Sequence, residues 1–129
     1  HIEQRVAARR DNFDDYTARI GSLPGITMMP ELEGDRATRW LSVIEIDTEL
    51  FGMSPDEIRL HLESENIEAR PLWKPMHLQP IFSGCRMIGG KVCEELFENG
   101  LCLPSGSALD QESRNRVVAA VGACCPSRS

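Results

Sequence analysis

The sequence contains no apolar run of the roughly 20 residues that a membrane-spanning helix requires, and its start shows no signal-peptide pattern. We therefore expect no membrane partner and a cytoplasmic location. Positive charge is also scarce, because 14 lysine and arginine residues face 20 acidic ones, for a net charge of −6. This balance argues against nucleic acid as a partner, since non-specific binding depends on neutralising phosphates. Local charge could still hold a small anionic ligand.

Closely spaced metal ligands are missing as well. Zinc ligands commonly pair two to four residues apart, whereas no C-x-x-C spacing joins the five cysteines, Cys85, Cys93, Cys102, Cys124 and Cys125. We expect no metal site and reduced thiols. Residues 84–91, GCRMIGGK, resemble a phosphate-binding loop, but Gly90 stands where that motif needs lysine. The double glycine is more simply a flexible entry to a helix.

Length and composition indicate a single globular domain, residues 1–129, with 41% hydrophobic and 26% charged residues. The chain begins at His1, and an amphipathic helix is already under way by Arg5. We therefore expect the chain to be a piece of a longer protein.

Periodicity and capping signals place the first elements. Apolar residues recur with helical spacing from Ile2 to Ile20, and residues 40–47, WLSVIEID, are rich in β-formers. Ser54 fits as the N-cap of a second helix and Glu57 as its capping-box partner, while Asn66 is suited to end that helix in a left-handed conformation.

Later elements complete an α+β fold class. Further strands are expected at 67–72 and 101–104, a helix at 91–98, and a last helix capped by Asp110. The strand, helix and strand from residue 40 to residue 72 suggest a βαβ-like or split unit. The expected picture is about three short core strands with about four helices, mostly on one face.

The segment from Ile67 to Ser83, which we name the strap, is the most informative part of the chain. Its sequence, IEARPLWKPMHLQPIFS, contains prolines at positions 71, 75 and 80. Proline fixes its own φ and biases the preceding residue toward extended geometry, so we expect a stiff, extended segment. Its mixture of cationic, aromatic, imidazole and amide groups favours presentation to a ligand.

Each candidate in the strap also has a plainer interpretation. His77, beside two apolar residues, is by composition more often a packed residue with one satisfied nitrogen than a catalytic base. Arg70 and Lys74 could clamp a phosphate or carboxylate, or could form a solvated salt bridge with a nearby glutamate. Trp73 could stack on a ring or cover core. After the strap, residues 104–107 could present backbone amides to an anion or form a plain loop.

The order of elements carries a family resemblance. RWLSVIEID, then SPDEIRLHLESENIEARPLWKPMHLQP, then ELFENGLCLPSG before a valine-rich helix resemble the C-terminal, small domain of the DegT/DnrJ/EryC1/StrS aminotransferases, which have fold type I. The resemblance covers nearly the whole chain. It implies a parent enzyme that uses pyridoxal 5'-phosphate to move an amino group from an amino-acid donor to a nucleotide-linked keto-sugar, for bacterial glycan or polysaccharide biosynthesis.

The sequence departs from that family in one respect. The family's cofactor is held by a lysine of the large domain, and the only lysines here are Lys74 and Lys91. We therefore expect the cofactor and its catalytic lysine to belong to the full-length enzyme, and this chain alone to be inactive, with no cofactor-binding or catalytic residue of its own.

The resemblance also assigns a role to the strap. In the family this domain covers one side of an active site at a homodimer interface, so the strap would face the sugar nucleotide. His77 matches the family's histidine in this motif and becomes the leading substrate-binding candidate, with Arg70, Trp73 and Lys74 behind it. A stand-alone, small-ligand-binding regulatory module is the alternative, since strand–helix–strand units of this size also build sensor domains.

Overall fold

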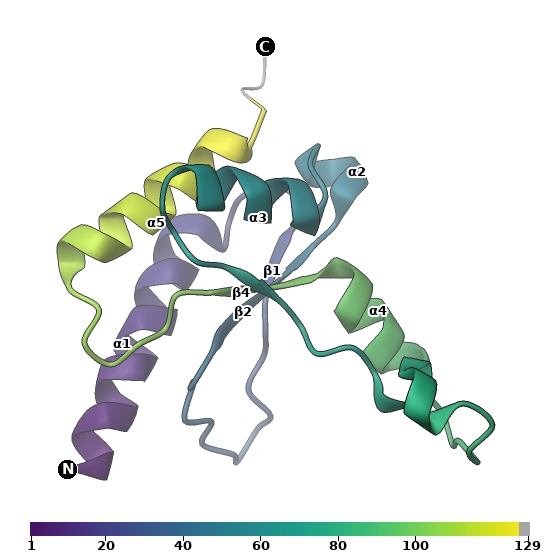
Figure 1. Cartoon of the computed structure of the whole chain (residues 1–129). Helices are drawn as coiled ribbons and strands as arrows, with labels where there is room; N and C mark the ends of the chain where they lie inside the picture. Colours follow the sequence, from purple (N-terminus) through teal and green to yellow (C-terminus); the bar gives the residue numbers. More distant parts are fainter. Residues whose placement is uncertain (127–129) are drawn as a thin grey trace.

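The computed structural model describes residues 1–126 and has an α+β fold (Figure 1). Four strands form one antiparallel sheet in the order β1-β2-β4-β3, with β1 at Ile26–Met28, β2 at Ser42–Ile46, β3 at Arg70–Pro71 and β4 at Gly100–Leu103. The helices are α1 (Ile2–Ile20), α2 (Thr48–Phe51), α3 (Pro55–Ser64), α4 (Lys91–Asn99) and α5 (Gln111–Cys124). The α+β prediction is confirmed, with one strand and one helix more than expected.

The predicted split unit is present. Both β2 and β3 run antiparallel to β4, which lies between them, so β2 and β3 are parallel and α3 connects them. The expected strand at 67–72 is shortened to Arg70–Pro71. Proline has no amide hydrogen and cannot extend a hydrogen-bonded ladder, which accounts for the early end of this edge strand.

Local signals around α3 behave as predicted. The Ser54 side chain accepts a hydrogen bond from the Glu57 amide, while the Glu57 carboxylate accepts one from the Ser54 amide at 2.7 Å. Asn66 follows the helix with φ of 57°, in the left-handed region that asparagine tolerates. At the start of α5, the Asp110 side chain acts as the N-cap and accepts a hydrogen bond from the Ser113 amide at 2.8 Å.

The core lies between the sheet and the group formed by α1, α3 and α5. In register, Ile44 of β2 stands opposite Leu101 of β4, and both are essentially inaccessible to solvent. They join one apolar cluster with helix residues that include Tyr16, Ile58 and Val121. Figure 1 shows these three helices gathered together, whereas α4 projects to the other side with the end of the strap. The expectation that most helices share one face therefore holds with α4 as the exception.

Candidate functional site

The strap leaves the sheet at β3 and forms an arm with α4 (Figure 1). The prediction of a fully extended strap is wrong beyond residue 75, where two short 3-10 helices follow, η1 at Met76–Leu78 and η2 at Pro80–Phe82. The fixed φ of proline fits a 3-10 turn as well as an extended chain. The Pro75 carbonyl accepts the Leu78 amide at 3.0 Å, which closes the first turn.

His77 is held against α4. Its Nε2 lies 2.6 Å from Oε1 of Glu94, and its side chain is 20% exposed. Gly90 is close enough that a Cβ there would stand 3.1 Å from the imidazole Cε1. The ring is thus packed with one satisfied nitrogen, as residue type alone favours. Within residues 1–126, Nδ1 makes no hydrogen bond, so it is the nitrogen that could meet a ligand.

Trp73 lies on the indole of Trp40, which ends the loop between β1 and β2. The ring centroids are 5.5 Å apart with an interplanar angle of 17°, an offset-stacked geometry. Both residues remain largely exposed, Trp40 by 59% and Trp73 by 66%. Trp73 does not cover the core, because most of it is exposed. One face of its ring is already stacked on Trp40, so stacking on a ligand alone does not describe its position either.

The two cationic candidates are exposed. Arg70 donates from Nε to Oε1 of Glu68 at 2.7 Å, in the solvated salt bridge that was the plainer alternative for this residue. The Lys74 side chain is also exposed, and its carbonyl accepts from the Gln79 side chain at 3.1 Å. Lys74 therefore lies on the strap between the Trp40–Trp73 pair and the His77–Glu94 pair.

Two partners of the site escaped the sequence analysis. Trp40 looked like the start of a buried strand, and Glu94 looked like an ordinary helix residue. Their contacts with the strap join positions 33 and 17 residues apart in sequence. No local pattern marks such pairs.

The 104–107 turn lies elsewhere, against α1. Two carbonyls of the turn accept hydrogen bonds from α1. The Tyr16 hydroxyl donates to the Pro104 carbonyl at 2.8 Å, and the Asn12 side-chain amide donates to the Gly106 carbonyl at 3.0 Å. Ser105 is buried and donates to the Leu103 carbonyl. These contacts favour the plain-loop interpretation and fasten the end of β4 to α1.

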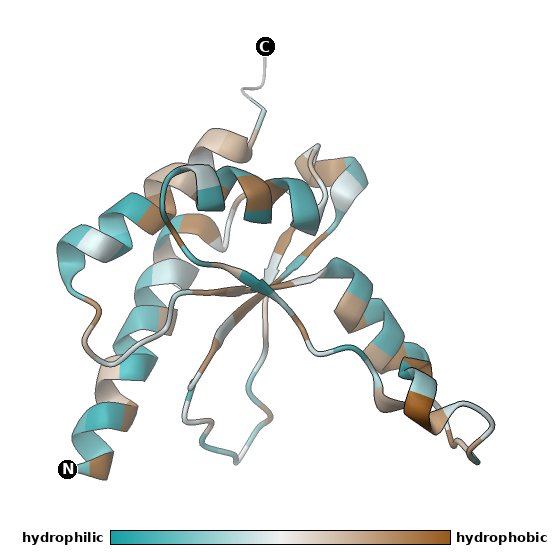
Figure 2. Ribbon diagram, in the orientation of Figure 1, coloured by the Kyte–Doolittle hydropathy of each residue, from teal (hydrophilic) through white to brown (hydrophobic). Residues whose placement is uncertain are grey.

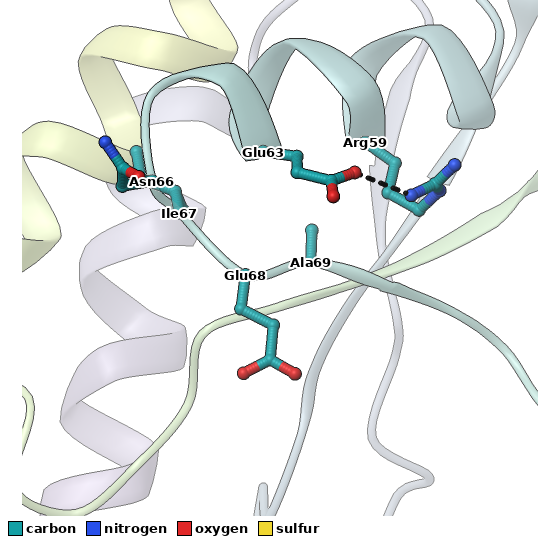
Figure 3. A pocket seen from close by; sticks show the side chains of 6 residues that line it. All are labelled: Arg59, Glu63, Asn66, Ile67, Glu68 and Ala69. Atoms are coloured by element: carbon teal, nitrogen blue, oxygen red, sulfur yellow. Dashed lines mark hydrogen bonds and ion pairs between the residues drawn. The ribbon is translucent and has the colours of Figure 1, made fainter.

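A surface hollow of about 410 Å³ lies at the end of α3 (Figure 3). In Figure 3 the Glu63 carboxylate points toward Arg59, and their ion pair measures 3.2 Å. The hollow is lined by this pair and residues 66–69 rather than by the four strap candidates. Among residues 1–126, no group of three or more histidine, cysteine or acidic side chains is arranged to hold a metal ion.

Both lysines are at the surface, on or near the arm. The Lys91 side chain is 89% exposed and lies 3.7 Å from Glu95. Lys74 is likewise open to solvent. Neither side chain is enclosed by the described residues. None of the helices in the described part combines the length and apolar character needed to cross a bilayer.

Comparison with known proteins identifies relatives over nearly the whole chain. EpsN of Bacillus subtilis (strain 168), named as a pyridoxal phosphate-dependent aminotransferase, is 42% identical over 121 residues, covering 91% of this chain and 30% of EpsN. GDP-perosamine synthase of Caulobacter vibrioides is 25% identical over 121 residues, covering 93% of this chain and 32% of that protein. The chain thus spans about a third of the length of these relatives.

Solved structures share the fold. The aminotransferase TlmJ from Streptoalloteichus hindustanus superposes with a TM-score of 0.83 at 20% identity, covering 95% of this chain and 32% of TlmJ. DesI, solved in the presence of its TDP-sugar product, gives a TM-score of 0.82 at 22% identity, covering 95% of this chain and 31% of DesI. The model of the DegT/DnrJ/EryC1/StrS aminotransferase family matches residues 1–122. The chain therefore belongs to the DegT/DnrJ/EryC1/StrS aminotransferase family.

Proposed function

We propose that this chain is the C-terminal, substrate-covering domain of a cytoplasmic aminotransferase. The parent enzyme would use pyridoxal 5'-phosphate to transfer an amino group from an amino acid to a nucleotide-linked keto-sugar, for bacterial glycan or polysaccharide biosynthesis. Family membership supports the reaction class, and it does not favour the alternative of a stand-alone regulatory module. The strap supports the role of this domain within that reaction.

The strap presents polar groups on an arm that projects from the core. His77, Trp73 and Lys74 lie on one short segment, fixed at both ends by side-chain contacts with other elements. A ligand-binding wall needs such fixed side chains, because groups held in advance lose less entropy when the ligand binds. In this proposal Lys74 attracts the substrate diphosphate, and Nδ1 of His77 meets a hydroxyl or phosphate oxygen. Arg70 lends further positive charge.

The arm also carries apolar side chains that its own fold leaves exposed. Figure 2 shows hydrophobic segments at the centre of the molecule and again at the far end of the arm. Ile81 is 81% exposed, Ile88 85% and Val92 69%. Several large apolar side chains exposed on one part of a molecule are typical of a surface that another domain or subunit covers. This supports a position of the arm against the large cofactor domain or the partner protomer of a homodimer.

The names of relatives support the substrate class. GDP-perosamine synthase carries a nucleotide-linked amino sugar in its name, and DesI was solved with a TDP-sugar product. In this proposal the cofactor and its lysine lie in the remaining two thirds of the enzyme; the exposure of both Lys74 and Lys91 supports this. On mixing with pyridoxal 5'-phosphate, the 129-residue chain should form no stoichiometric, borohydride-reducible adduct.

His77→Ala in the full-length enzyme tests the proposal. Loss of one substrate hydrogen bond should raise KM or lower kcat for the sugar half-reaction by about three- to thirtyfold. Loading of the cofactor by the amino donor, followed by its absorbance change, should remain within twofold. His61→Ala, a change of the same residue type on α3, is the matched control. Equal loss in both half-reactions would make His77 a structural residue and contradict the proposal.

A further inference from the structure

We propose that Trp40 is a positioning residue, which fixes the strap for the substrate by stacking on Trp73. This inference rests on the proposed function, since it concerns how the substrate wall is held. The loop between β1 and β2, residues 29–41, contributes Trp40 near its end, and the strap contributes Trp73 two residues after β3 ends. The contact joins two surface segments that no strand pairing connects.

The loop is anchored to α1 before it reaches Trp40. Glu31 accepts from both terminal nitrogens of Arg10, at 2.8 and 3.0 Å, and also from the Ala37 amide. The Arg10 hydrogen bonds, and then that of the Ala37 amide, lower the pKa of Glu31 from its usual 4.5 to about 2. The carboxylate is therefore charged at neutral pH, and the ion pair closes the loop onto the helix.

Arg39 adds a second anchor directly beside Trp40. Its backbone has φ of 51°, a left-handed conformation that a non-glycine residue keeps only where its surroundings impose it. Its guanidinium lies 3.7 Å above the Phe13 ring and donates to the Met29 carbonyl at 2.8 Å. The side chain is only 10% exposed. Arg9 donates to the Trp40 carbonyl itself. The Trp40 carbonyl and the side chain of the preceding residue, Arg39, are thus both attached to α1.

The strand pairing of the strap with β4 ends at Pro71, after which Leu72 packs beside Gly100 and Pro75 is buried. Among the described residues, the next side-chain hydrogen bond from the strap to another element is that of His77 with Glu94. The Trp40–Trp73 stack and the His77–Glu94 pair therefore bracket Lys74. More than half of each indole is exposed, so the stack adds little to the core. Its main consequence is the position of the strap.

The experiment is a double-mutant cycle of Trp40 and Trp73 in the full-length enzyme. An aromatic pair is worth about 0.5–1.5 kcal/mol, so Trp40→Ala should raise the KM for the sugar nucleotide about three- to tenfold. The amino-donor half-reaction and the thermal midpoint should stay near those of the wild type. Trp40→Phe, which keeps an aromatic face, should restore most of the affinity. Because Trp40 acts through Trp73, the double alanine variant should have no higher a KM than Trp73→Ala alone.

Controls separate this inference from the proposed function. Leu32→Ala, an exposed apolar change on the same loop, should leave the sugar KM unchanged. The positioning role is refuted if Lys74→Met raises the KM for the sugar nucleotide while Trp40→Ala does not. It is also refuted if the effects of Trp40→Ala and Trp73→Ala on that KM simply add. In either case the proposed role of the strap as a substrate wall is retained. If Lys74→Met, His77→Ala and Trp40→Ala all leave that KM unchanged, the proposed function fails and this inference with it. Should Trp40→Ala give too little folded enzyme, Trp40→Leu provides the same comparison.

Discussion

Tyr16→Phe isolates one hydrogen bond that fastens the end of β4 to α1. Tyr16 is completely buried, and its hydroxyl donates to the Pro104 carbonyl at 2.8 Å. Burial raises the pKa of this hydroxyl, so it remains a protonated donor at every pH in which the protein is studied. Phenylalanine keeps the ring and its packing in the core. The substitution therefore removes the donor and leaves the Pro104 carbonyl without its partner.

The expected loss follows from that unpaired carbonyl. The hydrogen bond is part-buried, and an acceptor left without its partner in such a place costs about 1–2 kcal/mol in the free energy of unfolding. With a urea m-value of roughly 2 kcal/mol/M for a chain of this size, the unfolding midpoint should fall by about 0.5–1 M. Urea titration followed by far-UV circular dichroism measures both the midpoint and the slope. The slope should be unchanged, because the surface exposed on unfolding is nearly the same.

A matched control distinguishes burial from simple contact. Ser107 accepts a hydrogen bond from Arg5 at 3.0 Å, joining α1 to the same turn, but this pair is exposed. Ser107→Ala should change stability by less than about 0.5 kcal/mol. Two results would contradict the role of the Tyr16–Pro104 hydrogen bond in fastening β4 to α1. One is a change of less than about 0.2 M in the urea midpoint of Tyr16→Phe, and the other is an equal loss of stability in both variants.

Two further perturbations test the loop anchor and the α4 entry. Because the pKa of Glu31 is lowered to about 2, the stabilisation it gains from Arg10 is complete above about pH 4.5 and is lost as the pH falls toward 2. Glu31→Gln should therefore have a lower urea midpoint than the wild type at pH 7, with the two converging near pH 2; parallel profiles would contradict this origin of the pKa shift. Gly90 has φ of 112°, so Gly90→Ala should cost about 1–3 kcal/mol of stability and push on His77, raising the sugar KM as well. Gly122→Ala, in open space on α5, should instead stabilise by about 0.5–1 kcal/mol, and the same sign for both changes would refute the strain at Gly90.

Features encoded within a few residues could be predicted from the sequence. The capping box of Ser54 and Glu57, the left-handed Asn66 and the cap at Asp110 each depend on a side chain and the nearby backbone. The fold class followed because helical apolar spacing, runs of β-forming residues and capping signals agreed on the order of elements. The four-residue α2 was missed and β1 was not assigned as a core strand, because elements this short carry too little periodicity to recognise.

Features that depend on distant residues could not be predicted. Proline content indicated a stiff strap, but proline is compatible with both extended and 3-10 geometry, so the turns at 76–82 were not distinguished. His77 was singled out, whereas its contact with Glu94 requires the arm to fold back on itself. Likewise, the role of Trp40 becomes visible only when the β1–β2 loop and the strap lie together. The candidate residues were therefore found more readily than the contacts that hold them.

The most direct test of the central claim is hydrogen–deuterium exchange of the full-length enzyme with and without the nucleotide-sugar substrate. The claim is that the strap forms one wall of the substrate site. Substrate should therefore slow exchange of amides in residues 72–83, while peptides from α5, at residues 111–124, exchange as before. Protection confined to other segments, with residues 72–83 unchanged at saturating substrate, would contradict the account.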